Sequence, residues 1–119
     1  MIKIEQIDEN EIVKVKASGT LTKEDYDQVV PELEKIMKEH KKVKFFVKLD
    51  HLEGMKWDAI KEELKFDRKY KEFFGKTAVV GEKKWQKWGT NISNLFFGSE
   101  IKFFYEDQTE EALDWLKAA

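Results

Sequence analysis

The chain opens with alternating hydrophobic and polar residues, which is the pattern of a strand with one buried face. Ile2 and Ile4 alternate with Lys3 and Glu5, and after a polar turn the alternation resumes over residues 12–17. Two short alternating segments joined by a polar turn predict an antiparallel hairpin, and Gly19 ends its second strand.

The strongest helix pattern in the chain begins after Thr22. Hydrophobic residues recur there with the 3.6-residue period of an amphipathic helix: Tyr26, Val29, Val30, Leu33, Ile36 and Met37. Thr22 and Asp25, three residues apart, have the spacing of a helix capping box. Pro31 lies inside this helix, and because proline removes a backbone donor we expect a kink there.

From residue 43 onward the pattern alternates between strands and helices. It predicts strands at 43–49, 77–80 and 101–105 and helices at 57–74 and 82–97. A loop is expected from Asp50 to Lys56. Asp107 is the predicted cap of a last helix, with Ala112, Leu113 and Leu116 facing inward.

The resulting order, β-β-α-β-α-β-α-β-α, predicts an α/β fold and a single domain over residues 1–119. Strands that alternate with helices favour parallel pairing, so we expect helices packed on a mixed, mostly parallel five-stranded sheet. The first strand is the expected antiparallel exception.

Charge and composition exclude several classes of function. The chain has 22 Lys and Arg against 24 Asp and Glu, a net charge of -2, which argues against a nucleic-acid partner. It contains no cysteine, so disulfides and thiolate chemistry are excluded. Neither a membrane-spanning run nor a secretion signal after Met1 is seen, and we expect a soluble, cytoplasmic protein.

The best group of titratable side chains is Asp50, His51 and Glu53, which follows the third predicted strand. Ligands bind at such strand ends in open α/β sheets, and a histidine beside carboxylates can act as a base or a metal ligand. A solvated loop is the simpler interpretation, because no second cluster of ligands supports a site. We therefore expect no catalytic residue, no metal, no cofactor and no enzyme activity.

Aromatic residues are concentrated in one part of the chain. Twelve of the sixteen fall between Trp57 and Tyr105. Bulky rings leave gaps in packing, so a ring-lined apolar pocket between the sheet and the second and third helices is one interpretation. The same stripes are also typical of helices that face a core. The residues we expect to line the pocket, or to form a lid over it, are Trp57, Tyr70, Phe74, Trp85, Trp88 and Phe96.

The layout and four sequence strings resemble the SpoIIAA-like family of small STAS-type domains over essentially the whole chain. The strings are residues 21–26, 78–85, 101–104 and 111–116, and the most distinctive segment is Val80 to Trp88. This resemblance implies a fold related in architecture to the CRAL-TRIO lipid-carrier domains, and it implies an apolar ligand and membrane association. Antagonists of anti-sigma factors in this group carry a phosphorylated serine after the third strand. The matching residues 50–57 contain no serine or threonine.

Two functions are compatible with these features. The first is a non-enzymatic module that carries or senses a nonpolar, lipid-like molecule, with peripheral attachment to a membrane surface; lysines beside the aromatic helix suit anionic lipid. The second is a protein-binding regulatory module that resembles the antagonists, with a partner surface at Asp50, His51, Glu53 and Lys56. Exposed aromatics and a sheet edge are also compatible with a homodimer.

Overall fold

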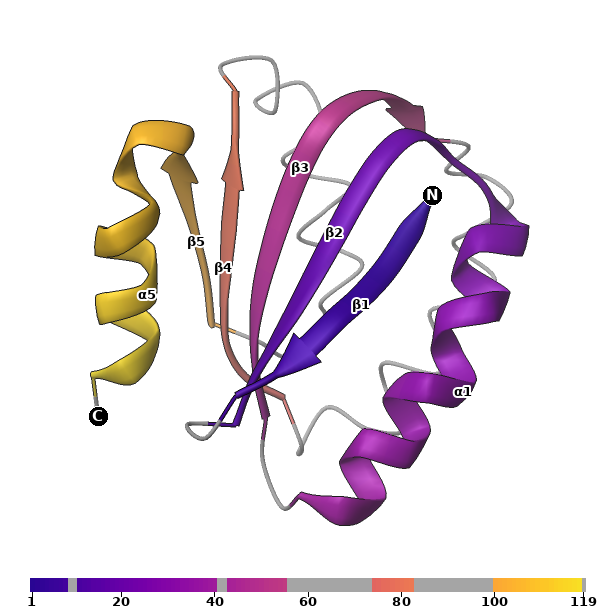
Figure 1. The fold of residues 1–119 in the computed structure, drawn as a ribbon, viewed down its shortest axis with the longest axis horizontal. Helices are drawn as coiled ribbons and strands as arrows, with labels where there is room; N and C mark the ends of the chain where they lie inside the picture. Colours follow the sequence, from indigo (N-terminus) through magenta and orange to yellow (C-terminus); the bar gives the residue numbers. More distant parts are fainter. Residues whose placement is uncertain (9–10, 41–42, 56–73, 83–99, 119) are drawn as a thin grey trace.

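Five strands form one sheet with helices on both of its faces (Figure 1). The computed structural model describes residues 1–8, 11–40, 43–55, 74–82 and 100–118. The described elements are β1 (Ile2–Ile7), β2 (Ile12–Leu21), α1 (Lys23–Glu39), β3 (Val43–Met55), β4 (Phe74–Gly81), β5 (Glu100–Tyr105), the 3₁₀ turn η4 (Glu106–Gln108) and α5 (Thr109–Lys117).

The strands lie in the order in which they occur in the chain, β1-β2-β3-β4-β5. β1 pairs antiparallel with β2, and the remaining three pairings are parallel. The prediction of a mixed, mostly parallel five-stranded sheet with an antiparallel first strand is confirmed. A bulge between Ile4 and Gln6 interrupts the β1–β2 register.

Each face of the sheet carries its own apolar cluster. On one face, alternate residues of β2 and β3 pack with the apolar side of α1. The buried members of this cluster are Val13, Val15, Ala17, Leu21, Val43, Phe45, Val47, Leu49 and Val79. The opposite face buries a second cluster under α5: Ile12, Phe46, Ala78, Val80, Phe104, Ala112 and Leu116. The alternation of side chains along each strand thus divides β2 and β3 between two cores.

The N-terminus of α1 has the capping box that its sequence predicts. The Thr22 hydroxyl accepts a hydrogen bond from the Asp25 N–H at 3.3 Å, and the Thr22 N–H donates to the Asp25 carboxylate at 3.0 Å. These two bonds satisfy backbone groups that the start of a helix leaves unpaired. Pro31 lies within α1, which continues unbroken to Glu39.

The C-terminal turn of α5 is held by lysines that come from the sheet. Lys44 on β3 donates to the carbonyl oxygen of Leu116. Lys76 on β4 donates to the carbonyl oxygens of Trp115 and Ala118, at 3.1 and 3.0 Å. Cations at this end of a helix also interact favourably with its dipole.

Several predicted boundaries were wrong. The residues predicted as a loop from Asp50 onward continue β3 as far as Met55, because they pair with the end of β2. Asp107 does not cap the last helix, since it lies inside η4 and the capping position is Gln108. Phe74 begins β4 instead of ending a helix.

The predicted inward face of the last helix is confirmed at two positions, since Ala112 and Leu116 are buried. Leu113 is partly buried and packs against the same cluster. The helices predicted within 57–73 and 83–97 lie outside the described residues.

Candidate functional site

The C-terminal ends of β3 and β4 bring three titratable side chains together. His51 Nε2 lies 3.6 Å from a carboxylate oxygen of Asp50, and His51 Nδ1 lies 3.9 Å from a carboxylate oxygen of Glu82. His51 has a φ of 52°, in the left-handed region that non-glycine residues seldom occupy. The side chain of His51 is 81% exposed, so this group faces solvent at the sheet edge.

A lysine from β2 completes the group. The Lys16 ammonium lies 3.0 Å from Asp50 Oδ2. The hydrogen bond from Lys16 lowers the pKa of the Asp50 carboxyl, and the same bond raises the pKa of Lys16. Both effects stabilise the charged forms, so Asp50 is an anion and Lys16 a cation at neutral pH.

An open hollow of about 330 Å³ lies beside this group. It is lined by Gly81, Glu82, Tyr105, Glu106 and Asp107, which lie at or just after the ends of β4 and β5. Three of the five are carboxylates, so the hollow favours a cationic or hydrogen-bond-donating group over an anion.

His51 lies between two carboxylates at the exposed edge of the sheet. The contacts of His51 with Asp50 and Glu82 are longer than a hydrogen bond between ring nitrogen and carboxylate. Within the described ranges, no three His, Cys, Asp or Glu side chains are grouped so that they could hold a metal ion. The arrangement is suited to recognition by charge.

The predicted site residues divide into two sets. Asp50, His51 and Glu53 lie on the terminal part of β3, and Glu53 is exposed. Phe74 is the first residue of β4. The other predicted site residues lie outside the described part of the chain: Lys56, Trp57, Tyr70, Trp85, Trp88 and Phe96.

No feature of the sequence alone indicates that Lys16 and Glu82 are neighbours of Asp50 and His51. Ser18 is paired with Asp50 across β2 and β3, which brings Lys16 within reach on the same face. The strand order and the β2–β3 register are therefore needed to place Lys16 beside Asp50. In the sequence, nothing distinguishes Lys16 from the other lysines that alternate with hydrophobic residues in this segment.

Figure 1 and the strand order together define an α/β domain of the STAS type, with a mixed sheet between α1 and α5. The sequence profile of the SpoIIAA-like family matches residues 12–117. The chain belongs to the SpoIIAA-like family.

A solved structure supports the same assignment. An uncharacterized protein of the DUF3478 family from Shewanella loihica PV-4, described as having a SpoIIAA-like fold, is 35% identical to this chain with a TM-score of 0.73. The match covers 98% of this chain and 92% of that one. Among curated proteins, none matches the sequence. Within the described part of the chain, no helix is long and apolar enough to cross a membrane.

Proposed function

We propose that this protein is a non-enzymatic binding module that carries or senses a nonpolar, lipid-like molecule, with peripheral attachment to a membrane surface. We base this proposal on the positions at which the chain leaves the sheet to enter its two aromatic segments, which begin near Trp57 and Trp85. Trp57 comes two residues after the end of β3, and Trp85 comes three residues after Glu82. His51 and Glu82 are neighbours, so both segments start from one edge of the sheet.

That edge is where ligands bind in open α/β sheets. Apolar pockets in proteins are lined mainly by hydrophobic and aromatic side chains with a few polar groups that orient the ligand. In the proposed pocket, the aromatic segments provide the apolar lining. Asp50, His51 and Glu82 provide the polar groups that orient the ligand.

Native mass spectrometry of the purified protein, followed by solvent extraction, tests this proposal. We expect a reproducible extra mass that is lost on extraction and restored by incubation with a long-chain fatty acid. A clean mass of 14.2 kDa that does not change with added fatty acid would contradict it.

Tryptophan variants locate the ligand. Trp88→Ala is expected to lose the bound mass and keep the circular dichroism of the wild type. Trp115→Ala is the matched control that keeps the ligand, because Trp115 lies beside Lys76 near the start of β4, at the other end of that strand from Glu82. If Trp88→Ala instead lowers the free energy of unfolding by about 3–5 kcal/mol, as for a buried tryptophan, Trp88 belongs to the core.

A protein-binding regulatory module is the second candidate, and the exposed end of β3 favours it. His51 and Glu53 are exposed there beside Asp50, and charged rims of this kind select partners. Residues 50–57 have no serine or threonine, so a phosphorylation switch at this position is not part of the proposal. A partner retained by wild type and by Glu32→Lys on α1, and lost with Glu53→Lys, would support this function.

A further inference from the structure

The sheet face that carries α5 is only half covered by the described residues. α5 packs on β3, β4 and β5. One row across the sheet pairs Lys3, Lys16, Lys48, Val80 and Phe104 in neighbouring strands. Val80 and Phe104 are buried in the cluster under α5, whereas the three lysines continue the same row beyond the helix.

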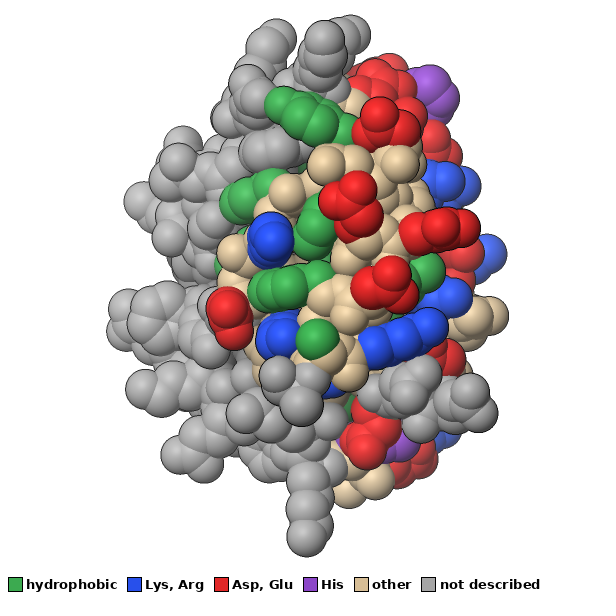
Figure 2. All heavy atoms as spheres, turned by 90° about the vertical axis from the view of Figure 1, so that its left-hand side faces the viewer, with side chains coloured by type: hydrophobic (Ala, Val, Ile, Leu, Met, Phe, Trp, Pro, Cys, Tyr) green, Lys and Arg blue, Asp and Glu red, His purple; other side chains and the backbone are tan. Residues whose placement is uncertain are grey.

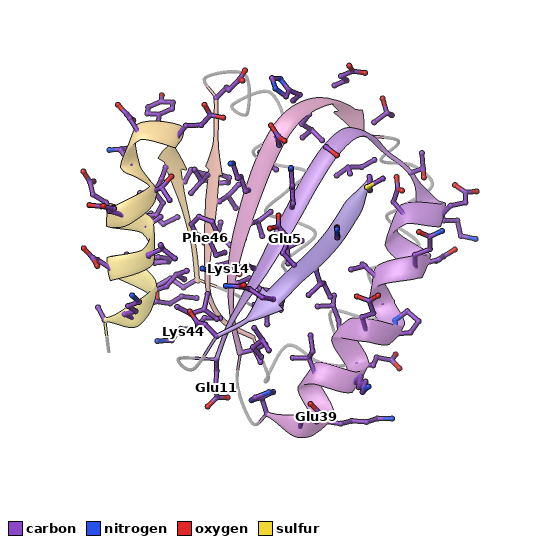
Figure 3. All side chains as sticks on the ribbon, viewed as in Figure 1. Glu5, Glu11, Lys14, Glu39, Lys44 and Phe46 are labelled. Carbon is purple, nitrogen blue, oxygen red and sulfur yellow. The ribbon has the colours of Figure 1, made fainter. Side chains whose placement is uncertain are left out.

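These lysines outnumber the two carboxylates that lie among them, Glu5 and Asp50, so this part of the face carries a net positive charge. Lys14 lies on the same face, paired with Phe46, and Figure 3 shows both on the α5 side of the sheet. We call Lys3, Lys14, Lys16 and Lys48 the lysine patch. A hollow of about 450 Å³ beside it is lined by Met1, Lys3, Glu5, Lys16 and Ser18. Like charges directly opposite each other destabilise a sheet, so the patch favours an anionic counterpart.

The outer surface of α5 carries a net negative charge, since its three exposed carboxylates outnumber the exposed Lys117 in its last turn. Glu110, Glu111 and Asp114 are exposed on it, and we call these three residues the acidic ridge. Within the described residues none of the three forms an ion pair. Figure 2 shows acidic and lysine side chains next to each other on this side of the molecule.

We propose that two copies of this chain form a two-fold dimer in which the acidic ridge of each copy docks on the lysine patch of the other. Among the described residues, α5 stands above one half of this face, and the other half carries the lysine patch. Because both surfaces lie side by side on one face, a two-fold axis between them satisfies both contacts at once.

The spacings of the two surfaces agree. Glu110 and Asp114 are four residues apart on a helix, a rise of about 6 Å. Lys14 and Lys16 are two residues apart on a strand, about 7 Å, and Lys16 and Lys48 lie on neighbouring strands about 5 Å apart. The assembly would have two sheets on the outside and the two α5 helices between them.

Sedimentation equilibrium tests the dimer. At about 50 mM salt we expect twice the chain mass of 14.2 kDa, with a shift to the monomer at about 500 mM because salt screens exposed charges. A monomer at low salt would overturn the proposal.

Charge-swap variants test the interface. Lys14→Glu with Lys48→Glu, and separately Glu111→Lys with Asp114→Lys, should each give monomers. Mixing the two variants should restore a dimer with one copy of each, because the contact between the two altered surfaces again joins opposite charges. Lys35→Glu on α1, on the other side of the sheet, is the control that stays dimeric. A dimer that survives either double variant, or a mixture that stays monomeric, would overturn the proposed interface.

Discussion

The Lys16 ammonium and the Asp50 carboxylate lie 3.0 Å apart, on neighbouring strands of the sheet. Lys16 is also part of the lysine patch, so this ion pair neutralises one of its four cations. The pair therefore links the proposed dimer surface with the end of β3, where Asp50 meets His51.

The Lys16–Asp50 pair should make stability depend on pH at both extremes. The pKa of Asp50 is lowered from 3.8, so its contribution is present above that value and is lost as the pH falls through the folded pKa. The pKa of Lys16 is raised from 10.5, so its contribution is present below that value and is lost as the pH rises through the folded pKa. Carbon-detected NMR titration should give Asp50 a lower pKa in wild type than in Lys16→Met. Equal values would contradict the assignment.

His51→Gly should be more stable than His51→Ala. The backbone of His51 has a φ of 52°, which glycine adopts without the cost of about 1 kcal/mol that a Cβ brings. Urea unfolding of the two variants measures the difference. Glu53, on the same strand, is the control position. There we expect Glu53→Gly to be less stable than Glu53→Ala. If both positions favour alanine, the backbone at residue 51 is not left-handed.

Thr77→Val should stabilise the protein by about 1 kcal/mol. Thr77 is fully buried on β4, and its hydroxyl has no hydrogen-bond partner within the described structure. Valine has nearly the same shape and removes the unpaired polar atom. Thermal unfolding checks this, and Thr77→Ser, which keeps the hydroxyl and loses a methyl group, should be less stable than wild type. A less stable valine variant would show that the hydroxyl is satisfied.

Lys76→Met should lower the free energy of unfolding by about 1 kcal/mol, as the loss of hydrogen bonds to a helix end predicts. The ammonium of Lys76 bonds two carbonyl oxygens at the end of α5 and lies 5.0 Å from the centre of the Trp115 ring. Denaturant unfolding followed by Trp fluorescence and circular dichroism measures the effect. Lys35→Met, on α1, is the control that should change stability little.

Hydrophobic periodicity predicted the fold well where a segment has one buried face. The alternation over residues 12–17 and the helical period after Thr22 correspond to β2 and α1. It failed at Asp50 to Met55, where polar residues extend β3, because pairing with β2 rather than residue type keeps that segment in the sheet. The prediction that Asp107 caps the last helix failed because the 3₁₀ turn η4 precedes α5 and includes Asp107.

The candidate site was predicted only in part, for a related reason. Asp50 and His51 follow one another in the chain, so sequence alone places them together. Lys16 lies on β2 and Glu82 follows the end of β4, and their positions depend on strand order and register. Such long-range neighbours leave no local signal.

The cluster under α5 has a consequence for the order of folding. It joins Ile12 on β2 to Leu116 on α5, and Lys44 bonds a carbonyl 72 residues away. Contacts between such distant residues form late, since the chain must first close the long loops between them. During synthesis, Phe46 and Val80 therefore stay uncovered by α5 until residues 109–117 have been made, and the second core is incomplete before that point.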